Sequence, residues 1–186
     1  MEVLSNWDQG LRFRLHHKKG LLDLINAVNG EIRNPVRLLQ LNKICEKYNI
    51  QLIQPSGLTY NNGWLSGFFD SDGSVYLNQI SSQMFITATQ KNIYVLNDLV
   101  NLYGGTIYAQ KESFKWVVYR KSEIIKLLDY FKMCPSRSAK QKRLLAIKRY
   151  HELRELKSHL QTENSILGKA WKKFLLKWDK WEKIEK

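Results

Sequence analysis

The sequence contains only two cysteines and three prolines in 186 residues, and it has no run of eighteen apolar residues. Two cysteines are too few for a disulfide framework in a chain of this size, and neither Cys45 nor Cys134 has the paired spacing of a zinc site. We therefore expect two reduced thiols among apolar helical residues. The lack of a long apolar run excludes a transmembrane segment. The first residues, MEVLSNWDQG, also lack the basic, acid-free character of a targeting peptide.

Acidic residues are scarce relative to basic ones. Thirty Lys and Arg stand against seventeen Asp and Glu, which leaves a formal charge of +13. Such an excess favours a polyanionic partner, since phosphate neutralisation releases counterions. Nucleic acid is the leading candidate and an anionic membrane surface is second. The 44% hydrophobic content is enough for a real core and excludes disorder throughout.

One stretch, GWLSGFFDSDGSVYLN at 63–78, combines a short apolar helix, an acidic turn and a strand. Leu65, Phe68 and Phe69 recur at the spacing of one buried helical face. The opposite face carries small or polar groups, which are Gly63, Ser66, Gly67 and Asp70. A glycine inside a helix costs about 1 kcal/mol relative to alanine, so Gly67 predicts a second backbone approaching closely. The helix is therefore predicted to pair through this small-residue face.

Two carboxylates, Asp70 and Asp72, lie where this helix is expected to end. The partial negative charge of a helix C-terminus disfavours acids unless a cation is present. A divalent ion with few protein ligands, completed by substrate phosphate, is typical of Mg²⁺. The alternative is an ordinary solvated Asp-Ser-Asp-Gly turn. A calcium loop is excluded by spacing, because Val75 and Ser81 would occupy its Gly and Glu positions.

Residues 65–73, LSGFFDSDG, resemble the LAGLIDADG motif of the intron-encoded homing endonucleases and RNA maturases of organelles. The resemblance implies that two such helices pack together and that Asp72 binds metal beside the scissile phosphate, assisted by the backbone carbonyl of Ser71. It also implies that Gln90 orients solvent and that Lys140 is the basic residue near the active site. Mg²⁺ is the implied cofactor, and a mitochondrion or another organelle the implied location. Without the resemblance, Gln90 and Lys140 are ordinary solvated polar groups.

The patterns along the chain predict an α+β fold. Residues 11–15 alternate as a strand, helices follow over 21–28 and 35–48, and a turn-rich linker occupies 54–62. Beyond the motif we expect strands over 74–80, 83–90, 106–111 and 114–120, and helices over 92–103, 122–133 and 138–160. Residues 63–160 thus form an α-β-β-α-β-β-α module with a four-stranded antiparallel saddle. Residues 161–186 form a basic, tryptophan-rich helix.

The chain also repeats itself. The segment 21–25 matches 124–128 at an offset of 103, and 37–39 matches 143–145 at an offset of 106. Residues 1–53 are therefore predicted to be the back half of a first module, with chance similarity of amphipathic helices as the alternative. The counterpart of Asp72 would lie upstream of Met1. A second half of the site is then expected from another chain or from an upstream segment.

The concave face of the saddle is predicted to bind nucleic acid through phosphate and base-edge contacts. The candidates are Arg12, Arg14, Tyr76, Asn78, Gln83, Thr87, Lys111, Lys115, Arg120 and Lys142. In the C-terminal helix, tryptophans alternate with lysines. This helix either docks its apolar face on the domain, stacks on nucleic acid or lies on a membrane surface.

Two functions follow from these observations. The first is a Mg²⁺-dependent homing endonuclease that hydrolyses duplex DNA once a partner half completes its site. The second is a non-catalytic RNA-binding protein, either a group I intron maturase or a structural component of a mitochondrial ribonucleoprotein such as the mitoribosome. The absent partner helix favours the second function, whereas Asp72 and Gln90 favour the first.

Overall fold

The computed structural model describes residues 14–185 and divides the chain into two compact units, Met1–Ser56 and Gly57–Lys186. The predicted strand over 11–15 lies partly outside the described residues, and Arg14 and Leu15 have no regular secondary structure.

Among its described residues, from 14 onward, the first unit contains the two predicted helices, α1 (Lys18–Val28), which begins three residues before the expected start, and α2 (Pro35–Tyr48). Asn34 caps α2, because its Oδ1 accepts hydrogen bonds from the backbone N–H groups of Val36 and Arg37. Asn49 ends the helix in the left-handed conformation. The buried core is small and consists of Ile25, Leu41 and Cys45.

The second unit has the predicted α+β order. It comprises α3 (Trp64–Asp72), β1 (Gly73–Asn78), β2 (Gln83–Gln90), α4 (Tyr94–Tyr103), β3 (Thr106–Ala109), β4 (Phe114–Val118), α5 (Lys121–Met133), α6 (Lys140–Glu155) and α7 (Ile166–Glu185). The strands form one antiparallel sheet in the order β1-β2-β4-β3. The predicted four-stranded fold is therefore confirmed.

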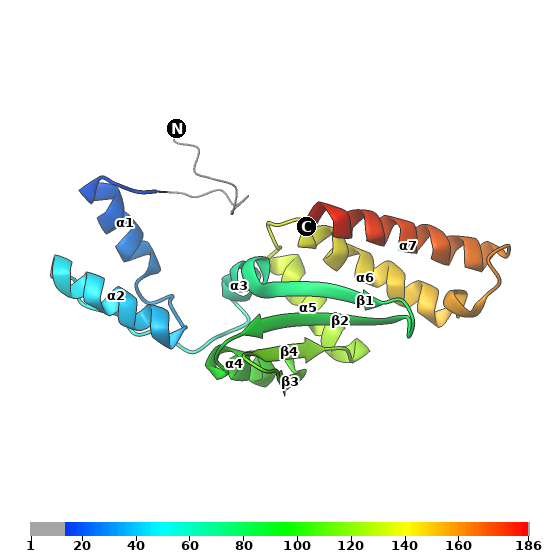
Figure 1. The fold of residues 1–186 in the computed structure, drawn as a ribbon, viewed down its shortest axis with the longest axis horizontal. Coiled ribbons are helices and arrows are strands. Elements are labelled where there is room, and N and C mark those ends of the chain that lie inside the picture. Colours follow the sequence, from blue (N-terminus) through cyan, green and yellow to red (C-terminus); the bar gives the residue numbers. More distant parts are fainter. Residues whose placement is uncertain (1–13, 186) are drawn as a thin grey trace. The chain divides into compact units, whose positions relative to one another are not determined.

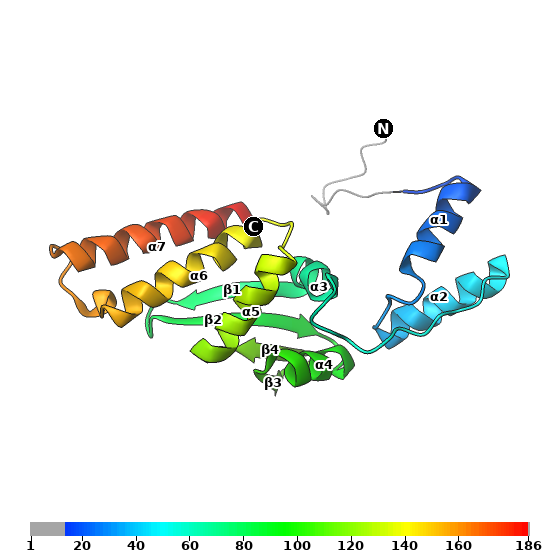
Figure 2. The ribbon, with the colours of Figure 1, turned by 180° about the vertical axis from the view of Figure 1, so that it is seen from behind.

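The sheet has one covered face and one open face. Alternate residues of β1 and β2, such as Val75, Leu77, Met84 and Ile86, are buried in the core. Helix α5 crosses this face, as the view from behind shows (Figure 2). Among the described elements of this unit, no helix crosses the opposite face (Figure 1). The open face is thus available to a ligand.

The C-terminal region differs from the prediction in its helix boundaries, since α6 begins at Lys140 rather than at 138 and α7 at Ile166 rather than at 161. The helix expected over 138–160 ends at Glu155, because Lys157 adopts the left-handed conformation with φ 53°. A short 3-10 turn, Ser158–Leu160, then leads to α7. Helix α7 runs alongside α6 (Figure 1).

The apolar face of α7 is docked on the domain. Trp171, Phe174 and Trp178 are buried, and the guanidinium of Arg143 on α6 lies 5.3 Å from the Trp178 ring centroid. Of the three alternatives for this helix, docking is the one observed, and the buried indole rings are not available to stack on bases. Within residues 14–185, no helix is long and apolar enough to cross a bilayer.

Candidate active site and nucleic-acid interface

Helix α3 delivers Asp72 to the end of the sheet. Leu65 and Phe69 anchor the helix in the core with no exposed surface, and Gly73 then begins β1 without an intervening loop. In the β1–β2 pairing Gly73 lies opposite Ala88, which places Gln90 beside the end of the helix. The Gln90 Nε2 donates a 2.7 Å hydrogen bond to Asp72 Oδ2. The fold thus brings together two residues that are eighteen positions apart in the chain.

Lys140 meets the same end of α3 from another part of the chain. Its Nζ donates to the carbonyl oxygens of Phe69 at 3.0 Å, Asp70 at 2.7 Å and Ser71 at 3.5 Å. The last carbonyls of a helix have no partner within the helix and carry partial negative charge. The ammonium group therefore supplies the cation that the acidic helix end was expected to require, independently of any metal.

The Asp70 side chain is hydrogen-bonded to residues 136–138 of the same chain. Its carboxylate accepts hydrogen bonds from the Arg137 backbone N–H at 2.8 Å, from the Ser138 hydroxyl at 2.8 Å and from the Ser136 hydroxyl. Burial alone would raise the pKa of Asp70, but these hydrogen bonds outweigh it and hold the pKa below its ordinary value. Asp70 therefore fixes residues 136–138, and with them the start of α6, against α3.

The residues at the end of α3 fit one part of a divalent metal site. Asp72 is exposed, and its Oδ2 accepts both from Gln90 and from the Ser71 hydroxyl at 3.1 Å. Within the described part of the chain, no hydrogen bond reaches Oδ1. No cluster of three or more His, Cys, Asp or Glu that could hold a metal occurs among residues 14–185. This arrangement suits Mg²⁺ held by one or two carboxylates together with phosphate and water.

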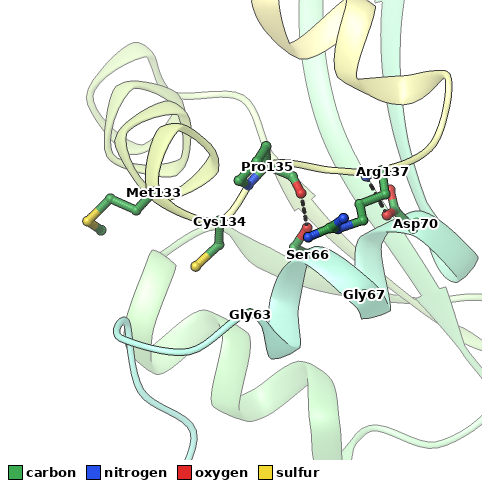
Figure 3. Close-up of a pocket in the computed structure, with 8 residues that line it drawn as sticks. All are labelled: Gly63, Ser66, Gly67, Asp70, Met133, Cys134, Pro135 and Arg137. Atoms are coloured by element: carbon green, nitrogen blue, oxygen red, sulfur yellow. Dashed lines mark hydrogen bonds between the residues drawn. The ribbon is translucent and has the colours of Figure 1, made fainter.

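The predicted pairing face of α3 lines a hollow of about 370 Å³ next to the α5–α6 connection (Figure 3). A Cβ built on Gly63 or Gly67 would meet nothing within 4 Å, so the close backbone neighbour predicted at Gly67 is not supplied by the described residues of this chain. The Ser66 hydroxyl donates to the Pro135 carbonyl at 2.9 Å. The two glycines therefore border open space, while Ser66 and Asp70 hold the neighbouring segment in place.

Several predicted nucleic-acid contacts share the open face of the sheet. Tyr76 is 50% exposed, and Gln83 and Lys115 are partly exposed. Asn78 lies there too, but its Oδ1 accepts from the backbone N–H groups of Ile80 and Ser81 and shapes the β1–β2 turn. Thr87 is only 5% exposed, because it occupies the centre of the sheet between Ser74 and Val117. It offers almost no surface to a ligand.

The remaining predicted contacts lie elsewhere. Lys111 is exposed in the β3–β4 turn, and Arg120 directly precedes α5 and forms an ion pair with Glu123 at 3.4 Å. Lys142 is exposed on α6 rather than on the sheet. Arg14 belongs to the first unit, and Arg12 lies outside the described residues.

Two aromatic residues of the open face were not among the nucleic-acid contacts predicted from the sequence. Phe85 alternates with Gln83 and Thr87 on β2, and Tyr119 directly follows β4. The Phe85 ring centroid lies 6.3 Å from that of Tyr119 and 6.1 Å from that of Tyr76. The alternation of β2 was a sufficient signal for Phe85, whereas Tyr119 joins the group only through the β2–β4 pairing.

The sequence is similar to intron-encoded proteins. The family described as LAGLIDADG endonuclease matches residues 65–151. Identity is 39% over 181 residues to the intron-encoded DNA endonuclease ai2b of Dictyostelium discoideum, which covers 91% of this chain and 69% of that protein. Identity is 40% over 179 residues to the intron-encoded RNA maturase bI4 of Saccharomyces cerevisiae, which covers 92% of this chain and 28% of that protein.

Two further comparisons extend this result. The probable intron-encoded endonuclease aI2 of Debaryomyces hansenii is 36% identical over an alignment of 198 positions, and the match covers 95% of this chain and 30% of that protein. The chain therefore spans less than a third of two of these three relatives. Among solved structures, the LAGLIDADG homing endonuclease I-GzeII in complex with its DNA target superposes with a TM-score of 0.51 at 18% identity. The match covers 87% of this chain and 58% of that one, and it shows a shared fold.

Proposed function

Because this chain belongs to the LAGLIDADG endonuclease family, we propose that it binds duplex DNA and hydrolyses a phosphodiester bond with Mg²⁺ once a second half completes its active site. The observation that carries the proposal is the 2.7 Å contact between Gln90 and Asp72 at the end of α3, where Lys140 also contacts the helix. The sequence resemblance assigned catalytic roles to these three residues.

Each of these residues has a chemical role in the proposed reaction. The Asp72 carboxylate and the Ser71 carbonyl would hold Mg²⁺, which supplies charge stabilisation and activates water when bound. The Gln90 amide is fixed on Asp72 Oδ2 and would orient the attacking water. The ammonium of Lys140 would offset negative charge that grows on the phosphate in the transition state. A single carboxylate from this chain forms half of such a site.

Exposed apolar residues in the first unit support the need for a second half of the active site. At the repeat offsets, Leu24 corresponds to Leu127 and Ile44 to Tyr150. Leu127 and Tyr150 are 0% and 5% exposed in the core of the complete module, whereas Leu24 and Ile44 are 47% and 40% exposed. Apolar side chains left in water at positions that otherwise bury against a sheet indicate an absent covering element. We propose that a sheet from an upstream segment or another chain covers them, and that its helix pairs with α3.

A cleavage assay tests this function. The chain and a form extended by its upstream coding sequence would be incubated with a randomised duplex library and Mg²⁺, and the cut ends sequenced. We expect cleavage by the extended form only. Asp72→Asn should abolish cleavage but leave DNA binding intact, while Asp98→Asn on α4, an exposed acid, should change neither.

Two results would contradict this proposal. Efficient double-strand cutting by the chain alone would remove the need for a second half. Full activity of the extended Asp72→Asn protein would remove the metal-ligand assignment.

RNA binding is the second candidate function, and it is supported by the 40% identity to the RNA maturase bI4. In that case the sheet would bind folded RNA by shape, phosphates and 2′-hydroxyls, in intron splicing or within a ribonucleoprotein. Asp72→Asn should then leave RNA association unchanged. The intron-encoded relatives also support the proposal of a mitochondrial location, which subcellular fractionation would test.

A further inference from the structure

Three aromatic rings form a row across the open face of the sheet. Tyr76 on β1, Phe85 on β2 and Tyr119 after β4 come from neighbouring strands in the order β1-β2-β4. The first pair of rings has centroids 6.1 Å apart with 29° between planes, and the second pair 6.3 Å with 52°. We call these three residues the aromatic row.

The rings of the aromatic row remain accessible. Tyr76 is 50% exposed, Tyr119 is 36% exposed and Phe85 is partly exposed. Cross-strand aromatic pairing accounts for the contact of Tyr76 with its register partner Phe85. Such pairing does not explain why a third ring extends the row. It also does not explain why the row keeps a large apolar surface exposed to water, and exposed apolar patches of this kind mark binding surfaces in proteins.

The surroundings of the row suit a polyanion. No acidic residue occupies an outward-facing position of the four strands, and one lysine does. These outward-facing positions are Ser74, Tyr76, Asn78, Gln83, Phe85, Thr87, Thr89, Thr106, Tyr108, Lys115 and Val117. This face therefore carries no negative charge that would repel a polyanion, and its exposed aromatic rings suit an occupant with flat, apolar faces.

We propose that the aromatic row binds unpaired bases of a single-stranded nucleic acid segment by stacking. Within a duplex the base faces are covered by their neighbours, so only base edges reach a protein through the grooves. Aromatic side chains instead stack on bases that have left the helix. The ring spacing of 6.1 and 6.3 Å also exceeds the rise of a stacked strand, about 3.4 Å per nucleotide. An extended, unstacked strand matches this spacing better.

The inference rests on the proposed function only in placing nucleic acid on the open face. It adds a preference for unpaired segments, such as RNA loops or a locally opened DNA strand. It assigns binding roles to Phe85 and Tyr119, which sequence reasoning did not select, and it requires no catalysis.

The test measures fluorescence anisotropy of labelled single-stranded RNA of about twelve nucleotides, of the same sequence as single-stranded DNA, and of the DNA duplex. The variant is Phe85→Leu/Tyr119→Leu, which keeps apolar volume beside Tyr76 but removes two π-faces, and neither residue is among the contacts predicted from the sequence. Tyr94→Leu on α4 is the matched control, because Tyr94 is 66% exposed and lies outside the sheet. Tryptophan fluorescence on urea unfolding verifies that all variants are folded.

We expect the double variant to lose at least about tenfold in affinity for both single strands and less than about twofold for the duplex. The slope of log affinity against log salt should stay unchanged, because no phosphate contact is removed. Tyr94→Leu should behave as the unmodified protein.

The inference would be overturned if the double variant lost equal affinity for duplex and single strands, or lost affinity for neither. An unmodified protein that binds duplex but not single strands would also overturn it, and would leave the proposed endonuclease function standing. Conversely, the expected single-strand losses in a protein whose extended form never cleaves DNA would support the inference and refute that function.

Discussion

Replacing Lys140 by methionine tests whether the end of α3 is stabilised by the ammonium of that residue. Methionine is also unbranched, is one heavy atom shorter than lysine, and has nearly the same helix propensity. The substitution removes the hydrogen bonds to the carbonyl oxygens of Phe69 and Asp70, at 3.0 and 2.7 Å, and the positive charge 5.9 Å from the Phe69 ring centroid.

The magnitude follows from two overlapping contributions. A hydrogen bond to a charged group contributes about 1.5–3 kcal/mol, and a cation at a helix C-terminus about 0.3–1 kcal/mol, or up to about 2 when partly buried. Both describe the same contacts, so they are not added. Lys140 is also partly exposed, which weakens the electrostatic part. We therefore expect Lys140→Met to lower the free energy of unfolding by about 1–2 kcal/mol.

Urea unfolding followed by tryptophan fluorescence measures this change. Five of the six tryptophans lie in Gly57–Lys186, so the signal reports mainly on that unit. The expected loss corresponds to a midpoint roughly 0.5–1 M lower in urea.

Lys142→Met is the matched control, because Lys142 is exposed two residues further along the same helix and should change stability by less than about 0.5 kcal/mol. Equal effects of the two substitutions would show that removal of any positive charge from α6 has the same consequence. The interpretation of Lys140 as the cation of the α3 end would then be wrong.

Three further perturbations follow from other contacts. Because the hydrogen bonds to Asp70 lower its pKa in the folded state, the stability it contributes is complete above its unfolded pKa of about 3.9 and is lost as the pH falls through the lower folded value. Between pH 6 and pH 3, urea titrations should therefore show a smaller decrease in the free energy of unfolding for Asp70→Asn than for the unmodified protein. Equal decreases in the two proteins would contradict this expectation. Gly67→Ala should raise stability by roughly 0.5–1 kcal/mol, since a Cβ there meets nothing within 4 Å, yet it should weaken pairing of α3 with a second helix. Thermal unfolding and cleavage by the extended form check the two effects, and a destabilised Gly67→Ala chain would argue against an open face. Trp178→Ala should lower the free energy of unfolding by about 3–5 kcal/mol, because its ring lies on the docked face of α7 and is 2% exposed, whereas Leu176→Ala, at a position 64% exposed, should lower it by less than about 0.5 kcal/mol. If urea unfolding showed comparable losses of stability for Trp178→Ala and Leu176→Ala, α7 would not be docked through its tryptophan face.

Local sequence patterns were sufficient to predict most helices and strands of this fold. The boundaries of α2 and β2 agree with the sequence, because Pro35 and Asn49 delimit one and strict alternation defines the other. The same reasoning extended α6 to Leu160, since apolar spacing continues past the point where Lys157 takes a left-handed backbone conformation. A periodic pattern identifies a helix more reliably than its last residue.

The candidate site was predicted in part. The resemblance of residues 65–73 to a known motif singled out Asp72, Gln90 and Lys140, and the structure brings Asp72 and Gln90 into contact. Their catalytic roles stay predictions. The functions of Asp70 and Lys140 within the fold were not foreseen, because the first was assigned to a pairing face and the second only to the active site.

The helices and strands, the acidic end of α3 and the excess of positive charge can be predicted from the amino-acid sequence, because periodicity, composition and a contiguous motif depend on near neighbours in the chain. The folded chain was needed to show that Lys140 neutralises that helix end, that Asp70 binds residues 136–138 and that three aromatic rings align across the sheet. Those contacts join residues separated by up to about seventy positions. Their formation depends on strand pairing and on packing around a common core, which no local pattern encodes.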